Sequence, residues 1–198
     1  MILSLDASTQ RGSVALIRDR QVVQELFPET PRGRGGALFS CLAKILREGP
    51  EIRRVVVGIG PGSYNGIRSA IAAAWGIAMA RDIPLVGISS ILGLDDASYV
   101  AVGDARRGQY FFARINHGAF LSGPELLTKD QLATAVQQSP GLPVFASAPV
   151  EFLPGIVIRT PSAARLGMLA AHWVPNHPQP LYLKAAHITT SRRVNDRR

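Results

Sequence analysis

The chain has 198 residues, of which 46% are hydrophobic and 18% charged, and this composition is that of a globular protein and excludes a disordered one. Its single cysteine, Cys41, excludes a disulfide framework and is expected to be a small core residue. The formal net charge of +8 favours polyanionic partners such as RNA. Residues 1–6 lack the basic start of a signal peptide, and the apolar segment 69–80 is too short to span a bilayer, so a cytoplasmic protein without membrane contact is predicted.

The first half of the chain predicts a three-stranded meander followed by two helix–strand pairs. Short β-branched runs between polar turns indicate the strands, and apolar residues spaced three and four apart indicate the helices. The expected strands are residues 2–5, 13–17, 22–27, 55–59 and 85–88, and the expected helices are 38–48, 64–80 and a short one at 89–96.

The second half repeats this plan in a shorter form. Strands are expected at 99–102, 110–115 and 144–146, and helices at 128–138, which opens with a Thr128–Gln131 capping box, and from Thr160 onward. Each half begins with a strand that ends in Asp-Ala, followed by a polar turn, a glycine and another strand. Asp6 leads in this way to Gly12, and Asp104 leads to Gly108. The repetition indicates a duplicated unit.

A duplicated unit of meander and helices is the plan of actin-like, ribonuclease-H-like proteins, an α/β fold in which two lobes face each other across a cleft. We therefore expect a first lobe at 1–97, a second lobe at 98–190 and a basic tail at 191–198. Residues 141–158 leave little room for further strands, so the second lobe is expected to be reduced.

The most informative segment is 55–70, where a buried strand turns into an apolar helix through Gly60, Gly62 and Gly66. Glycines at such a turn let the backbone approach another group closely, either an anion at the helix N-terminus or another backbone. The spacing misses the dinucleotide fingerprint by one residue, and no Gly-Lys-Ser/Thr follows, which excludes a Walker A loop. An anion site and an architectural turn both stay open.

Asp6 and Asp104 are the acidic residues that recur in matched contexts. A strand-end aspartate facing a cleft can hold a metal-bound phosphate or position a water, but it can also close its own hairpin by accepting backbone N–H bonds. The candidate nucleotide or anion cleft comprises Asp6, Ser8, Thr9, Gly60, Gly62, Ser63, Asp104 and Arg106. The histidines form no pair at helical spacing, so no metal site is expected, and no Gly-x-Ser-x-Gly elbow occurs.

The helix at 64–80 has almost no polar face. A helix that is apolar all round is buried on all sides, and in a protein this small a partner chain is expected to cover one side. The expected partner surface consists of Arg68, Ala70, Ile71, Ala74, Trp75 and Ala78. The alternative is burial between the sheet and neighbouring helices. The tail arginines at 192, 193, 197 and 198 permit RNA contact, although no aromatic interleaving marks a single-strand platform.

Four segments, in order along the chain, resemble the TsaB (YeaZ) family. They are residues 2–16 (ILSLDASTQRGSVAL), 60–68 (GPGSYNGIR), 104–110 (DARRGQY) and 180–184 (PLYLK). The second segment resembles the most distinctive motif of the family, although Tyr64-Asn65 stand where Phe-Thr is usual. The loop at 31–36 also departs from the family, because it replaces a polar segment that contains histidine.

The resemblance implies a bacterial cytosolic subunit that supports threonylcarbamoyl transfer to the adenosine next to the anticodon of tRNA. In that system TsaD is the catalytic, metal-binding subunit and TsaE is an ATPase. TsaB is a scaffold that forms a homodimer, or a heterodimer with TsaD, through first-lobe helices. The resemblance thus implies no activity and no intrinsic cofactor in this chain, tRNA contact through the complex, and ATP or ADP only at the partner interface. The alternative is a stand-alone actin-like ATPase or kinase that uses Asp6 and Asp104.

Overall fold

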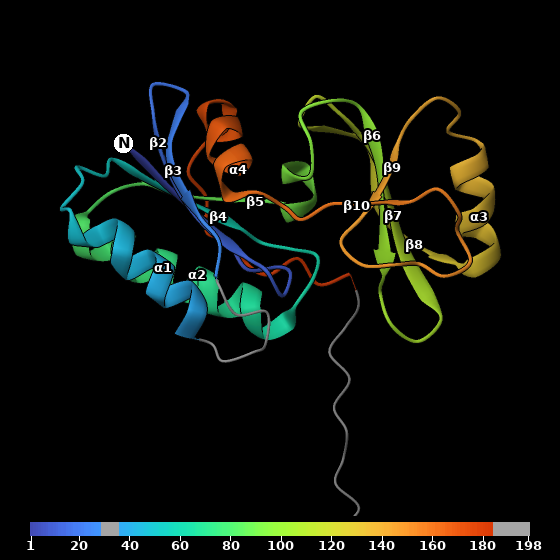
Figure 1. The fold of residues 1–198 in the computed structure, drawn as a ribbon, viewed down its shortest axis with the longest axis horizontal. Helices are drawn as coiled ribbons and strands as arrows, with labels where there is room; N and C mark the ends of the chain where they lie inside the picture. The colour runs from blue at the N-terminus through green and yellow to red at the C-terminus, as the bar shows by residue number, and fades with distance from the viewer. Residues whose placement is uncertain (29–35, 184–198) are drawn as a thin grey trace, which may run out of the picture.

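The first lobe is built on a five-stranded mixed sheet (Figure 1), in a computed structural model that describes residues 1–28 and 36–183. Its strands, in the order β3-β2-β1-β4-β5, are β1 (Ile2–Asp6), β2 (Ser13–Arg18), β3 (Gln21–Leu26), β4 (Arg54–Gly58) and β5 (Leu85–Ile88). Strand β1 pairs antiparallel with β2 and parallel with β4, and β4 pairs parallel with β5. The basic tail and residues 31–35 of the atypical loop lie outside the described residues.

The second sheet repeats the first, strand for strand. Its strands, in the order β10-β9-β6-β7-β8, are β6 (Tyr99–Asp104), β7 (Gln109–Asn116), β8 (Ala119–Thr128), β9 (Val144–Ala146) and β10 (Val157–Ile158). Strand β6 pairs antiparallel with β7 and parallel with β9, which in turn pairs parallel with β10. Followed from β8 to β10, the second sheet has the same strand order and the same strand directions as the first sheet followed from β3 to β5. This match confirms the predicted duplicated, two-lobed α/β fold.

Helices cover both faces of the first sheet (Figure 1). The helical elements are α1 (Gly36–Arg47), α2 (Tyr64–Arg81), η1 (Ser90–Gly93), α3 (Lys129–Gln137), α4 (Ala163–Leu169) and η2 (Ala170–His172). Leu3 and Leu5 of β1 belong to the core under α1 and α2, because alternate side chains of a strand point to opposite faces. On the other face, Gly167 of α4 lies against Ser4 and Ile17. Among the described residues, no helix has the length and apolar character needed to cross a membrane.

The second lobe is reduced by one helix rather than by its strands. In the first lobe, α2 connects β4 to β5, whereas residues 147–156 connect β9 to β10 without a helix. The expectation that residues 141–158 leave little room for strands was therefore wrong, because β9 and β10 are short. Strand β8 was not predicted at all. It carries Gly123-Pro124 in its middle and lies at the edge of its sheet, where a proline is tolerated.

The two lobes share a hydrophobic core at their junction. Val56 and Ile88 of the first sheet and Tyr99 and Phe145 of the second sheet belong to one buried cluster, together with Leu166 of α4. The Tyr99 hydroxyl donates to the Ile91 carbonyl at 2.6 Å, and burial raises the pKa of Tyr99 to about 12. Helix α4 lies within the range expected for the second lobe, yet it packs on β1, β2 and β4 of the first sheet. The chain thus returns to the first lobe before its end.

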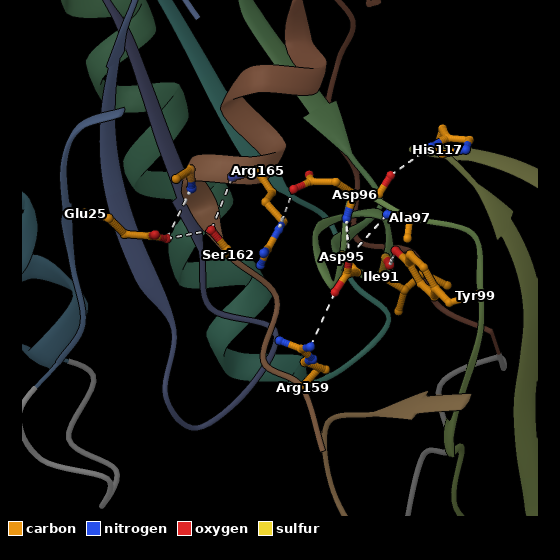
Figure 2. Close-up of polar contacts among 11 residues, drawn as sticks. Glu25, Ile91, Asp95, Asp96, Ala97, Tyr99, His117, Arg159, Ser162 and Arg165 are labelled. Carbon is orange, nitrogen blue, oxygen red and sulfur yellow. Dashed lines mark hydrogen bonds and ion pairs between the residues drawn. The ribbon is translucent and has the colours of Figure 1, made fainter. Parts of the chain in front are cut away.

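Polar contacts fix α4 and the segment between the lobes (Figure 2). Glu25 of β3 accepts a hydrogen bond from the Ser162 hydroxyl at 2.9 Å and one from the Ala164 N–H at 3.2 Å. The Ala163 N–H donates to the Ser13 hydroxyl at 2.8 Å. These bonds satisfy N–H groups at the start of α4, which have no partner within the helix.

Two acidic residues of the segment between the lobes complete this network (Figure 2). Asp96 pairs with Arg165 of α4 at 3.4 Å, and Asp95 pairs with Arg159, which follows β10, at 3.6 Å. Burial raises the pKa of Asp95, but the N–H groups of Ala97 and Asp96 and the two arginines outweigh it, so the pKa is lowered. The segment is therefore tied to α4 on one side and to the second lobe on the other.

The outer edge of β5 is covered by the returning chain. The Asn176 side chain accepts from the Gly87 N–H at 2.8 Å and donates to the Gly87 carbonyl at 3.3 Å, while the Asn176 N–H donates to the Leu85 carbonyl at 3.1 Å. Farther on, the Leu181 N–H donates to the Ile59 carbonyl at 2.8 Å. These bonds occupy an edge that would otherwise be free to pair with another strand.

Glu25→Ala should destabilise the protein by about 1–2 kcal/mol, because it leaves N–H and O–H donors at the start of α4 without an acceptor. The control is Glu51→Ala, which removes an ion pair with Arg53 whose side chains are both 76% exposed and which should change stability by less than about 1 kcal/mol. Urea unfolding followed by circular dichroism measures both. Equal losses in the two variants would show that Glu25 does not hold α4.

Candidate functional site

The turn between β4 and α2 is filled by the backbone of the β1–β2 hairpin. A side-chain carbon at Gly62 would overlap the Ser8 carbonyl oxygen, and one at Gly66 would overlap the Ala7 carbonyl oxygen. The Ser63 N–H donates to the Ser8 carbonyl at 2.7 Å. Gly62 also has a φ of 156°, a conformation that favours glycine. The sequence left either an anion or another backbone as the group that approaches these glycines. In the structure, the backbone of Ala7 and Ser8 lies there.

Two serines engage the polar backbone groups of Gly60. The Gly60 N–H donates to the Ser90 hydroxyl at 2.9 Å, and the Gly60 carbonyl accepts from the Ser90 N–H and from the Ser89 hydroxyl, each at 2.8 Å. The Ser63 hydroxyl accepts from the Gly66 N–H at 3.3 Å, which makes Ser63 the N-cap of α2. The backbone donors of Gly60, Ser63 and Gly66 thus bond within the protein, and an anion could use them only by displacing these bonds.

Asp6 lies fully buried at the carboxyl end of β1. Its Oδ1 accepts from the Ser8 N–H at 2.9 Å and from the Ser8 hydroxyl at 2.7 Å. Its Oδ2 makes no hydrogen bond of good geometry, although the Ser90 hydroxyl lies beside it, and the missing side chain of Gly58 provides the space for it. Burial raises the pKa of Asp6, and the nearby Ser90 hydroxyl and the hydrogen bonds from Ser8 partly oppose this increase. Asp6 therefore closes its own hairpin.

Asp104 makes the matching contact in the second lobe. It is exposed at the end of β6, and its Oδ1 accepts from the Arg106 N–H at 2.6 Å, while its Oδ2 lies 3.7 Å from the Arg106 guanidinium. The predicted cleft residues therefore fall into two groups. One group meets around the β4–α2 turn, next to Thr9: Asp6, Ser8, Gly60, Gly62 and Ser63. The other group, Asp104 and Arg106, lies on the β6–β7 hairpin.

Metal ligands do not gather in the described part of the chain. Residues 1–28 and 36–183 contain no group of three or more His, Cys, Asp or Glu side chains placed to hold a metal ion. Cys41 of α1 is buried in the first-lobe core, as its apolar neighbours predicted.

Helix α2 presents a different face to the surface from the one predicted. Four residues assigned to the partner surface are buried in the first-lobe core, where α2 packs on β4, β1 and β5: Ala70, Ile71, Ala74 and Ala78. Their spacing follows the helical repeat of three to four residues, so all four lie on one face of α2. That assignment was wrong for these four, while Arg68 is exposed and Trp75 is half-buried.

The exposed face along the second half of α2 includes Ala72, Gly76 and Met79, which is 73% exposed. It continues into a groove of about 330 Å³ between the end of α2, the start of β5 and residues 175–177. There the Trp75 ring stacks on His177 with ring centres 5.4 Å apart. Small side chains on the helix and a larger anchor at its end give a surface that another protein chain could approach closely.

Sequence reasoning missed a cluster at the other end of α2, which we call the tyrosine cluster: Tyr64, Tyr182 and Arg68. The two rings stack with centres 5.3 Å apart and an angle of 23° between them, and each tyrosine is about half exposed. The Arg68 guanidinium lies 5.1 Å from the centre of the Tyr64 ring and donates to its hydroxyl at 2.8 Å. No local pattern signals this cluster, because Tyr182 reaches it only through the returning chain.

Comparisons with known proteins identify the family of this chain. Residues 37–122 match the family model described as TsaD, tRNA N6-adenosine threonylcarbamoyltransferase. The TsaB protein of Escherichia coli (strain K12) is 29% identical over 124 residues, which are 57% of this chain and 53% of that relative. An uncharacterized protein of Mycobacterium tuberculosis (strain H37Rv) is 30% identical over 198 residues, covering 92% of this chain and 91% of that protein. The chain belongs to the TsaB (YeaZ) family.

A solved structure shares the fold of this chain. YeaZ from Pseudomonas aeruginosa has a TM-score of 0.70 and 22% sequence identity, covering 86% of this chain and 90% of that chain. This likeness concerns the fold alone. The chain spans about half the length of the curated TsaB relatives it matches, 53% for the E. coli protein and 52% for that of Bacillus subtilis (strain 168).

Gly66→Ala and Gly76→Ala should change stability in opposite directions, although both glycines lie in α2. Alanine at Gly76 meets nothing within 4 Å and should stabilise the helix by about 0.5–1 kcal/mol. Alanine at Gly66 overlaps the Ala7 carbonyl and should destabilise the protein by about 1–3 kcal/mol. Urea unfolding of the two variants measures the difference. Similar shifts would contradict the close approach of the hairpin.

Asp6→Asn should make stability depend less on pH. Because the pKa of Asp6 is raised in the folded protein, its neutral form contributes stability that is complete below the ordinary value of 3.8 and is lost as the pH rises through the folded value. Asparagine keeps the acceptor for Ser8 and does not ionise. The variant should therefore gain stability relative to the wild type as the pH rises from about 4 to 8, in urea unfolding at several pH values.

Asp6→Ala provides the comparison for this experiment, because it removes the acceptor as well as the charge. It leaves the Ser8 N–H and hydroxyl unpaired and should destabilise the protein by about 1–3 kcal/mol. Stability curves for Asp6→Asn and the wild type that run parallel with pH would show that Asp6 ionises in the folded protein as it does in the unfolded chain.

Proposed function

We propose that this chain is a non-catalytic scaffold subunit in the biosynthesis of threonylcarbamoyladenosine in tRNA. Relatives from E. coli and B. subtilis carry the name tRNA threonylcarbamoyladenosine biosynthesis protein TsaB. The match of residues 37–122 to the TsaD model supports a role beside a catalytic subunit of related fold. Two features support a non-catalytic role beside that partner. Asp6 is buried, and the β4–α2 turn is filled by the β1–β2 hairpin, so both make their contacts within this chain.

The observation that carries the scaffold role is the exposed face of α2. Ala72 and Gly76 are exposed in the middle of a long helix, and beyond the local backbone of α2 nothing lies within 4 Å of a side-chain carbon built at Gly76. Small residues let a second helix approach closely, and Met79 and the groove beside Trp75 add apolar contact at one end. A TsaD-type partner, or a second copy of this chain, would bury this face.

Co-expression of this chain with the TsaD homologue of the same organism, followed by size-exclusion chromatography, tests the proposal. We expect the two proteins to elute together in a fixed ratio. Two separate peaks over a range of salt concentrations and with or without ATP would refute the scaffold role.

Gly76→Arg should abolish this association or weaken it at least about 10-fold, because a large charged side chain would be buried unpaired in the interface. The substitution replaces glycine by a better helix former, so the free chain should stay folded. Gln137→Arg is the matched control, since Gln137 is exposed on α3 of the second lobe. Unchanged co-elution of Gly76→Arg would show that the exposed face of α2 is not the contact surface.

A further inference from the structure

The tyrosine cluster offers open aromatic surface. Tyr64 is 49% exposed and Tyr182 is 48% exposed, although the two rings stack on each other with centres 5.3 Å apart. A ring that is half exposed while one of its faces contacts a neighbour still presents much of its remaining surface to solvent. Aromatic rings exposed in this way are the surface on which unpaired nucleobases stack in proteins that bind single strands.

The charge around the tyrosine cluster is positive. Arg68 lies over the Tyr64 ring at 5.1 Å, and neither α2 nor residues 173–183 contain an aspartate or a glutamate. The chain as a whole carries a formal net charge of +8. A guanidinium next to exposed rings can pair with a phosphate while the attached base stacks. The charge is therefore complementary to a nucleic acid.

A second arginine–aromatic pair joins the hairpin that fills the glycine turn to the residue after β3. The Arg11 guanidinium lies 5.1 Å from the centre of the Phe27 ring, which is 39% exposed. Arg11 belongs to the turn that begins at Ser8, whose carbonyl accepts from the Ser63 N–H directly before Tyr64. Both segments that meet at the glycine turn thus carry an arginine that lies over an aromatic ring.

We propose that the tyrosine cluster binds an unpaired nucleotide of RNA, with the base stacked on Tyr182 or Tyr64 and the phosphate paired with Arg68. This inference rests on the proposed function, which makes tRNA the substrate of the complex. It adds that this subunit contacts the RNA itself, through a surface at the opposite end of α2 from the groove beside Trp75. RNA is favoured over a protein partner because the two segments carry arginine and exposed rings but no acidic residue, the combination that single strands require.

Fluorescence anisotropy with the full chain and a labelled single-stranded oligoadenylate tests the proposal. Tyr182→Ala should weaken binding about 5- to 100-fold, whereas Tyr182→Phe, which keeps the ring, should bind like the wild type. Arg68→Gln should weaken binding and reduce the slope of log K against log salt by about 0.7, the value for one phosphate of a single strand. Phe39→Ala is the matched control, since Phe39 is 45% exposed on α1, and it should leave binding unchanged.

Four outcomes would overturn the proposal. One is the absence of binding by the wild-type chain up to about 100 µM at low salt. Another is an equal loss for Tyr182→Ala and Phe39→Ala. A third is a loss of TsaD co-elution in Tyr182→Ala without any loss of RNA affinity, which would make the cluster a protein contact. The fourth is normal co-elution of Tyr182→Ala together with unchanged RNA binding, which would refute the RNA contact and leave the scaffold role intact, so the two proposals fail separately.

Discussion

The close approach of the Ala7–Ser8 backbone to Gly62 and Gly66 is the contact on which the first lobe depends. It places the β1–β2 hairpin against the start of α2, and the hydrogen bond from Ser63 to Ser8 fixes the two segments to each other. The same turn holds Ser89 and Ser90 through Gly60, and Leu181 bonds to the Ile59 carbonyl just before it. Four parts of the chain therefore meet at one turn, and this arrangement requires residues without side chains where the backbones touch.

This constraint argues against a phosphate-binding role for the conspicuous glycines. A loop that binds an anion needs backbone N–H groups directed at open space, but the donors of Gly60, Ser63 and Gly66 have acceptors within the protein. Asp6 is likewise buried and bonded to Ser8, so its carboxylate also makes its contacts within the chain. What remains exposed is α2 itself, with small residues and a groove toward one end and the tyrosine cluster at the other. The proposed protein and RNA contacts would therefore both use the surface of α2 and leave the interior of the lobe unchanged.

Much of the fold could be predicted from the sequence, because local patterns specify it. The β-branched runs and the helical spacing placed most strands and helices, and the repeated Asp-Ala-turn-Gly signature predicted the duplication. Strand β8 was missed because Gly123-Pro124 interrupts its pattern, which an edge strand tolerates. The buried face of α2 was assigned wrongly because nearly all its residues are apolar, so composition does not distinguish Ala74 in the core from Ala72 at the surface. The tyrosine cluster could not be predicted, because it depends on the path by which residues 174–182 return along β5.

The exchange rates of the backbone N–H groups of residues 60–66, measured by hydrogen–deuterium exchange with and without ATP, test the central claim most directly. If the turn is architectural, the Gly60 and Ser63 N–H groups, which donate to Ser90 and Ser8, should exchange slowly, and ATP should leave their rates unchanged. Fast exchange in the free chain that becomes slow when ATP is added would contradict this claim and would show that the turn binds phosphate.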